Sequence, residues 1–404
     1  MPAKINPPGA IPRNFGETPE IICRRIDCGQ DPLSIPQKFL LSDPFVRQVM
    51  LCYAFWRKGG VMSNESYVFA GLGGETAPDR EVHTGLYRIA EGSEKWEALS
   101  NGLPEAPEIR ALTVHPRLPN VIFAGTQNGP YRSDDHGAHW GKVGVPDRGL
   151  PVWSFLFHPR DPDVMFVGYE NCEIYRSEDT GKTWEPLPVS VRFPDITTAP
   201  GANPVKRVLM MAASETEPDL LYAAIEVGGI IRSTDGGASW ENLSEGQYVS
   251  DDTVDMHGIL ASRWRPGTVY SIGRAGMFVS PDAGDHWKHV PLEPLNAKGM
   301  IYCRDIREVP GNSRKIWVSA GADFQSDTGV LLYSRDGGDS WERVDMGLKP
   351  GATMFKLACD ERHPNRISCA TNGGEIFSSK DAGENWHSLP ALPEGRLIYA
   401  LART

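Results

Sequence analysis

A recurring turn pattern, S-x-D-x-G-x-x-W, constrains the fold of this 404-residue chain more than any other feature. A decayed seventh copy, LYRIAEGSEKW, ends at Trp96. The closing tryptophans follow one another at intervals of 44 to 56 residues. Repeats of this length are typical of propeller blades or solenoid coils. The six well-preserved copies are Ser133 to Trp140, Ser177 to Trp184, Ser233 to Trp240, Ser280 to Trp287, Ser334 to Trp341 and Ser379 to Trp386.

Each copy has the chemistry of a tight hairpin turn. The Asp carboxylate and the Ser hydroxyl can hydrogen-bond to backbone N–H groups of the turn. The glycine tolerates a positive φ that other residues resist. We expect the tryptophan to pack between neighbouring sheets, where it buries a large apolar area.

Short strands flank each turn. The clearest are residues 109–116, 120–126 and 129–133, with a fourth strand expected after the tryptophan. Four short strands per repeat, arranged radially, predict an all-β fold: one seven-bladed β-propeller over residues 61–404. Residues 1–60 are predicted to be an extension packed on the propeller.

The ring needs a closing strand. Residues 394–404 match the first strand of the other repeats, and residues 66–72 read as a second strand. We therefore predict that the C-terminal segment supplies the innermost strand of the first blade. The competing candidate is residues 46–56, which could be strand or helix.

Composition excludes several classes of protein. The net charge of −11 argues against nonspecific binding to nucleic acid or anionic lipid. No apolar run is long enough to span a membrane, and the first residues lack the apolar core of a signal peptide. The seven cysteines are scattered and show no CxxC or zinc spacing. We therefore expect reduced thiols and a cytoplasmic location.

The six turns resemble the Asp-box (BNR) repeat. That repeat is found in sialidase-like propellers, sortilin-type receptors, family 74 glycoside hydrolases and photosystem II assembly propellers. The resemblance covers roughly residues 61–404 and implies a propeller whose turns lie away from the ligand face. The chain departs from sialidases in lacking their RIP-type element, and it departs from family 74 enzymes in having one propeller where they have two. Sialidase and polymer-cleaving activities are therefore not expected.

The opposite face is the expected place for chemistry. Aligning the innermost strands on their apolar pattern places one residue per blade at the mouth of the central channel; the positions of Arg207 and Arg304 need small gaps. Arginines there could grip a carboxylate or phosphate with paired N–H bonds. Alternatively, each arginine pairs with an acid such as Glu108, Asp305 or Glu226 and plugs the channel. The seven aligned residues are Arg110, Trp153, Arg207, His257, Arg304, Phe355 and Tyr399.

Loops between second and third strands add candidates near that mouth. Glu170 and Glu226 occupy equivalent positions in adjacent blades and could form a catalytic carboxylate pair. Arg274 and Asn171 lie in equivalent loops, and His83 lies in the expanded loop 71–85. Each could contact a substrate, although a lone charged loop residue is usually just solvated.

One further insertion is acidic. Residues 244–258 bring Asp251, Asp252 and Asp255 near His257 in sequence. This segment could hold a divalent metal or an acid–base cluster, or it could be a solvated surface loop. The sequence itself requires no cofactor.

Two functions follow. In the first, the chain is a hydrolase or lyase acting on a small anionic, sugar-like or aromatic substrate. Arg110, Arg207 and Arg304 would hold the anion, and Trp153 and Phe355 would wall the pocket. The catalytic residues would be His257, Glu170, Glu226 and Tyr399. In the second, the chain is a noncatalytic propeller that docks a protein partner.

Overall fold

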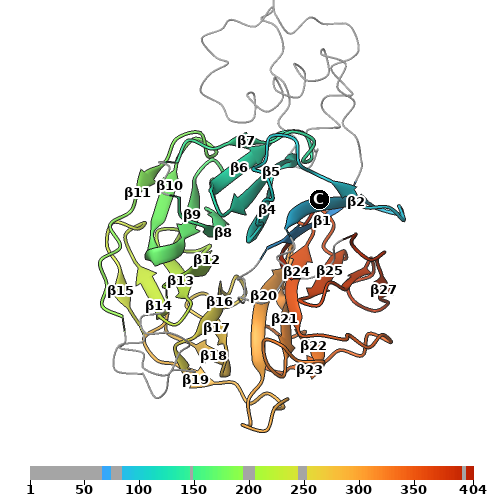
Figure 1. Cartoon of the computed structure of the whole chain (residues 1–404). Coiled ribbons are helices and arrows are strands. Elements are labelled where there is room, and N and C mark those ends of the chain that lie inside the picture. Colours follow the sequence, from blue (N-terminus) through green and yellow to red (C-terminus); the bar gives the residue numbers. More distant parts are fainter. Residues whose placement is uncertain (1–65, 74–83, 146–148, 194–204, 244–252, 394–396) are drawn as a thin grey trace, which may run out of the picture. The chain divides into compact units, whose positions relative to one another are not determined.

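The computed structural model describes residues 66–73, 84–145, 149–193, 205–243, 253–393 and 397–404. Within them, seven antiparallel sheets of four strands stand in a ring, and the predicted all-β seven-bladed propeller is confirmed (Figure 1). A 3-10 turn lies at Glu170–Cys172. Contacts divide the chain into two units, Met1–Asn64 and Glu65–Thr404. The predicted extension, residues 1–60, lies outside the described residues, and so does the competing strand at 46–56.

We number the blades in chain order and give their strands from the axis to the rim. Blades 1 to 3 are β28 (Ile398–Arg403), β1 (Tyr67–Leu72), β2 (Gly85–Ala90), β3 (Glu97–Ala98); β4 (Ala111–His115), β5 (Leu118–Thr126), β6 (Gly129–Ser133), β7 (Gly141–Lys142); and β8 (Val152–Phe157), β9 (Met165–Tyr169), β10 (Ile174–Ser177), β11 (Glu185–Pro186).

Blades 4 to 7 follow the same order. They are β12 (Val208–Ala213), β13 (Leu221–Ile225), β14 (Gly229–Ser233), β15 (Glu241–Asn242); β16 (Met256–Ala261), β17 (Val269–Gly273), β18 (Gly276–Ser280), β19 (Lys288–His289); β20 (Tyr302–Val309), β21 (Asn312–Gly321), β22 (Gly329–Ser334), β23 (Glu342–Arg343); and β24 (Met354–Cys359), β25 (Ile367–Thr371), β26 (Ile376–Ser379), β27 (His387–Ser388).

The repeat turn joins the third and fourth strands of blades 2 to 7 and has the predicted hydrogen bonds. In blade 3, the Gly181 N–H donates to Ser177 Oγ (2.8 Å). The Thr183 N–H and Oγ1 donate to the two Asp179 carboxylate oxygens (2.8 and 2.7 Å). Trp184 Nε1 donates to the Gly181 carbonyl (3.0 Å). These bonds satisfy the polar groups of the turn without water and hold the tryptophan against the sheet.

Arginines connect neighbouring blades through these turns. Arg132, on the third strand of blade 2, donates through Nη1 to the Thr180 carbonyl in the next turn (2.7 Å). Thr180 has a left-handed backbone (φ 58). Arg88 and Arg232 make the same bond to His136 and Ala283 of the blades that follow them. Each such turn is therefore fixed by its own residues and by the preceding blade.

The predicted ring closure is confirmed. β28 pairs antiparallel with β1, with Phe69 opposite Ala402 and Ala70 opposite Leu401. The end of β28 is also held by side chains, because Thr404 Oγ1 accepts a hydrogen bond from the Tyr67 N–H (2.9 Å). Blade 1 is thus assembled from segments at the two ends of the described chain.

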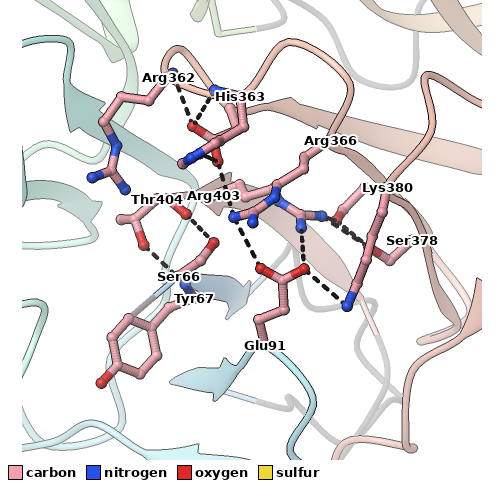
Figure 2. Close-up of polar contacts among 12 residues, drawn as sticks. Ser66, Tyr67, Glu91, Arg362, His363, Arg366, Ser378, Lys380, Arg403 and Thr404 are labelled. Atoms are coloured by element: carbon pink, nitrogen blue, oxygen red, sulfur yellow. Dashed lines mark hydrogen bonds and ion pairs between the residues drawn. The ribbon is translucent and has the colours of Figure 1, made fainter. Parts of the chain in front are cut away.

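A cluster of charges joins blade 1 to blade 7 at this closure (Figure 2). Glu91 contacts Lys380 Nζ and Arg366 Nη1, each at 2.9 Å, and Arg403 Nη2 at 3.7 Å. Burial alone would raise the pKa of Glu91, but the three cations outweigh it and lower the pKa. Glu91 stands five residues before Trp96, the same spacing as Asp135 before Trp140, so it occupies the aspartate position of the decayed turn.

Acid should weaken the repeat turns. Slight burial raises the pKa of Asp179, but hydrogen bonds from Thr183 and Ser177 outweigh it and bring the pKa to about 2. Hydrogen bonds from Ser239 lower the pKa of Asp235 to about 2 as well. An unfolded aspartate has a pKa of about 3.9, so this stabilisation is complete above that pH and is lost as pH falls toward 2.

We therefore expect the free energy of unfolding in urea to fall between pH 5 and pH 2. Tryptophan fluorescence would measure it for the wild type and for Asp179→Asn, which lacks the titrating charge. The difference between the two proteins should shrink as the pH is lowered. A difference that stays constant over this range would contradict the assignment.

Candidate functional site

In six blades a β-bulge places one residue of the innermost strand at the same end of the ring, and blade 2 has an equivalent residue just before its strand. In blade 3, for example, Val152 pairs with Tyr169 and Ser154 with Gly168, so Trp153 is left without a partner. In blade 2, both Arg110 and Ala111 lie opposite Gly125. Such a bulge re-aims the side chain of the extra residue. The bulge residues of the other blades are Leu209, His257, Arg304, Phe355 and Tyr399.

This geometry corrects one position of the predicted ring. The bulge residue of blade 4 is Leu209, because Val208 pairs with Ile225 and Met210 with Ala224. Arg207 lies two residues earlier, before β12 begins. The other six aligned residues are the bulge residues of their blades, or in blade 2 the equivalent extra residue.

The aromatic bulge residues pack on one another. The ring centroid of Tyr399 lies 6.2 Å from that of Trp153 and 5.2 Å from that of Phe355, both edge-on. With Leu209 they form one apolar cluster in which no side chain is more than 8% exposed. Burial raises the pKa of the Tyr399 hydroxyl despite the nearby Arg304, so the phenol stays protonated. These aromatics therefore form a packed floor and do not stand apart as the walls of an open pocket.

Two arginines of this site are neutralised by glutamates. Arg110 lies 4.8 Å above the Trp153 ring, and its Nη2 is 2.5 Å from Glu108 Oε2. Arg207 lies 4.9 Å above the same ring, and its Nη1 is 2.6 Å from Glu226 Oε2. The alternative prediction, that acids pair with these arginines, thus holds for both. Asp305, also suggested as a partner, instead lies 3.0 Å from Arg307 Nε.

The predicted carboxylate pair converges on Arg207. Glu170 Oε1 lies 3.8 Å from Arg207 Nε, and it accepts a hydrogen bond from Trp153 Nε1 (3.4 Å). Glu226 contacts the other side of the same guanidinium. The two glutamates from adjacent blades are brought together as the sequence suggested, with the arginine between them.

Arg304 differs from the other two arginines. It stacks 4.4 Å above the Phe355 ring and is only 6% exposed. Its Nη1 donates to the Tyr302 hydroxyl (3.4 Å), and its Nε has no hydrogen-bond partner. Burial opposes its charge, but the surrounding field, with Tyr302 and Glu226 foremost, raises its pKa. No ion pair joins it to a carboxylate within the described residues.

His257 is buried and held by two contacts. Its Nδ1 lies 2.7 Å from the Cys303 carbonyl, so Nδ1 carries a proton and donates it. Its Nε2 lies 3.6 Å from Asp255 Oδ1. Burial would raise the pKa of Asp255, but the attraction of His257 and of two arginines outweighs it and lowers the pKa. His257, predicted as a catalytic acid or base, therefore has both ring nitrogens in contact with neighbouring groups of the propeller.

The remaining predicted residues are spread more widely. Arg274 follows β17, and its N–H donates to the Asp255 carbonyl (3.1 Å). Asn171 is exposed in the 3-10 turn after β9, with φ at 58°. His83, Asp251 and Asp252 lie outside the described residues. In the part of the chain that is described, no three His, Cys, Asp or Glu side chains are grouped to hold a metal ion.

No helix in the described ranges is long and apolar enough to cross a membrane.

The described cysteines are reduced. Burial raises the pKa of both Cys172 and Cys303 to about 12, so neither thiol is reactive at neutral pH. These cysteines fill space between blades.

Comparisons with known proteins agree with the fold. The family described as photosynthesis system II assembly factor YCF48 matches residues 282–398. An oligoxyloglucan-reducing end-specific xyloglucanase of Emericella nidulans is 25% identical over 222 residues, which cover 51% of this chain and 26% of the relative. A Ycf48 assembly lipoprotein of Synechococcus is 24% identical over 265 residues, which cover 57% of this chain and 74% of the relative.

The similar solved structures belong to the same two groups of proteins, the xyloglucanases and YCF48. The family 74 xyloglucanase of Xanthomonas campestris aligns with a TM-score of 0.55 at 18% identity, covering 73% of this chain and 46% of that one. YCF48 bound to a D1 peptide aligns with a TM-score of 0.50 at 16% identity, covering 80% and 93%. The chain spans about a quarter of the length of the Emericella xyloglucanase. The resemblance to BNR-repeat propellers, at the level of the superfamily, is thereby confirmed.

Replacing His257 should destabilise the ring. His257→Ala removes the donor to the Cys303 carbonyl and leaves Asp255 without its histidine, which should cost about 1–3 kcal/mol of unfolding free energy. Urea unfolding would measure it, with His289→Ala as the control because His289 is exposed on the rim strand β19. Equal midpoints for the two variants would show that His257 has no structural role.

Proposed function

We propose that this chain is a noncatalytic binding propeller whose central mouth captures the carboxylate of a peptide or protein partner on Arg304. The observation that carries this proposal is the contrast between the arginines. Arg110 and Arg207 each contact a glutamate, while Arg304 has no carboxylate within ion-pair distance among the described residues. A guanidinium can bind a carboxylate through two parallel N–H bonds. The buried guanidinium of Arg304 has no described acid in that role, so it can take the carboxylate of a partner.

The packing of the mouth supports a partner rather than an enclosed substrate. Trp153, Phe355 and Tyr399 are at most 7% exposed and contact one another, so they form a rigid floor. A ligand would rest on this floor and present its charged group to Arg304. The similarity to YCF48, solved with a bound peptide, is consistent with such a ligand. We place this function in the cytoplasm, where buried reduced thiols are stable.

Peptides with and without a free carboxylate test the proposal. We would screen a library of fluorescently labelled peptides, each made with a free and with an amidated C-terminus, by anisotropy. Wild type should bind some free-acid peptides at least tenfold more tightly than their amides, and Arg304→Gln should lose that preference.

The control variant is Lys182→Gln. Lys182 is exposed in the blade 3 repeat turn, at the other end of the strands, and its replacement removes the same charge. It should bind as the wild type does. Equal affinity for acid and amide peptides, or equal binding by wild type and Arg304→Gln, would rule the proposal out.

A second candidate is a glycoside hydrolase. One observation favours it: Glu170 and Glu226 reach a common point from adjacent blades, as the paired carboxylates of glycosidases do. The similarity to xyloglucanases supports the same choice. Its catalytic pair would be these glutamates, with Arg207 holding an anionic or polar group of the substrate.

Release of reducing ends from xyloglucan oligosaccharides tests this candidate. If it is right, wild type produces new reducing ends, and Glu226→Gln lowers the rate at least about 100-fold. The same Glu226→Gln protein should keep peptide binding if the first proposal is right. No release by wild type, or an unchanged rate in the variant, would exclude the hydrolase.

A further inference from the structure

Glu170 is a carboxylate of the central mouth that has to share its cation. Its Oε1 accepts a hydrogen bond from the neutral Trp153 Nε1 (3.4 Å) and lies 3.8 Å from Arg207 Nε. Arg207 is closer to Glu226, with 2.6 Å between Nη1 and Oε2. One guanidinium therefore serves two glutamates, and Glu226 has the shorter contact.

The other described cations on this side of the mouth are engaged elsewhere. Arg110 contacts Glu108, with 2.5 Å between Nη2 and Oε2. Lys206 donates through Nζ to the Val227 carbonyl. Neither cation contacts Glu170 within the described residues. Around Trp153 the described glutamates therefore outnumber the arginines by one.

Glu170 is also open to a ligand. Its side chain is 18% exposed, and within the described part of the chain only Oε1 takes part in a contact. The ring of Trp153 is not open in this way, because Arg110 and Arg207 lie 4.8 and 4.9 Å above it from the blades on either side. A cation of a ligand would thus pair with Glu170 and not stack on the indole.

Arg304 is the opposite case, at the other end of the aromatic floor. It stacks 4.4 Å above the Phe355 ring, is 6% exposed and has an Nε without a hydrogen-bond partner. Tyr399 lies between the two ends, because its ring packs edge-on against both Trp153 and Phe355. The floor therefore has a poorly matched acid at the Trp153 end and an unmatched cation at the Phe355 end.

Such a floor favours a ligand that has charges of both signs. A ligand with a carboxylate alone would pair with Arg304 and add one more negative charge to a mouth that already contains Glu170. A ligand with a second, positive group would gain an ion pair at the other end. Charges placed in this way select among partners and fix the direction in which a chain lies across the site.

We propose that the mouth binds the C-terminal end of a peptide chain that has a basic residue near that end. The terminal carboxylate would pair with Arg304, and the lysine or arginine side chain of an upstream residue would pair with Glu170. The chain would lie across Tyr399 with its carboxyl end above Phe355. This inference rests on the function proposed above and specifies its ligand.

Paired peptides test this inference. Starting from the free-acid peptide that the wild type binds most tightly, each upstream position would be made once as lysine and once as norleucine, which is similar in length and uncharged. By anisotropy, the wild type should bind the lysine peptide about three- to tenfold more tightly at one position or more.

Glu170→Gln should lose the preference for lysine and keep the preference for a free acid over an amide, because Arg304 is unchanged. The glutamine still offers Trp153 Nε1 an acceptor, so the floor should stay packed. Glu178→Gln is the matched control. Glu178 is exposed in the blade 3 repeat turn, where it contacts Arg176 (3.1 Å), and it should keep both preferences when it is replaced.

The two levels of the proposal fail in different ways. Equal binding of the lysine and norleucine peptides at every position, or an unchanged lysine preference in Glu170→Gln, would overturn this inference and leave the capture of a carboxylate by Arg304 intact. Equal loss of the lysine preference in Glu170→Gln and Glu178→Gln would overturn it as well. A wild type that binds acids and amides equally would overturn both the inference and the function on which it rests.

Discussion

The hydrogen bonds inside the repeat turn determine most of this structure. A serine hydroxyl and an aspartate carboxylate satisfy the backbone N–H groups of the hairpin, so the turn between the third and fourth strands is closed without help from solvent. The tryptophan can then enter the space between blades. A carbonyl of the turn accepts a hydrogen bond from an arginine of the preceding blade. One local arrangement thereby sets the hairpin, the core between blades and the contact between neighbours.

The face opposite these turns depends on a different local feature, the β-bulge. A bulge in the innermost strand of six blades, and the equivalent residue Arg110 in blade 2, presents one side chain per blade at this end of the ring. Together with Arg207 and the glutamates that contact the arginines, these residues decide the chemistry of the face. Aromatic residues fill the axis, and arginines stack on them. Because two of those arginines are matched by glutamates, Arg304 determines how this face meets an anion.

The fold was predictable because its signals are local. The turn motif, the strand pairs and the closing strand at 394–404 follow from spacing and from apolar runs. The position of Arg207 was wrong because β12 has an apolar run, Val208 to Met211, in which nothing marks Leu209 as the bulge residue. Arg207 contacts Glu170 and Glu226, which lie in loops of two adjacent blades. The spacing of residues along the sequence does not show how close such loops come in space.

The closure of blade 1 has a consequence for the order in which the protein is made. β28 is synthesised after every other strand of the ring, yet it pairs with β1, and Ser66 and Thr404 meet across 338 positions of the chain. Until β28 leaves the ribosome, β1 has an unpaired edge, and such edges recruit other chains. Blade 1 therefore lacks its innermost strand until β28 has been made. Chaperones that shield strand edges would matter most during that interval.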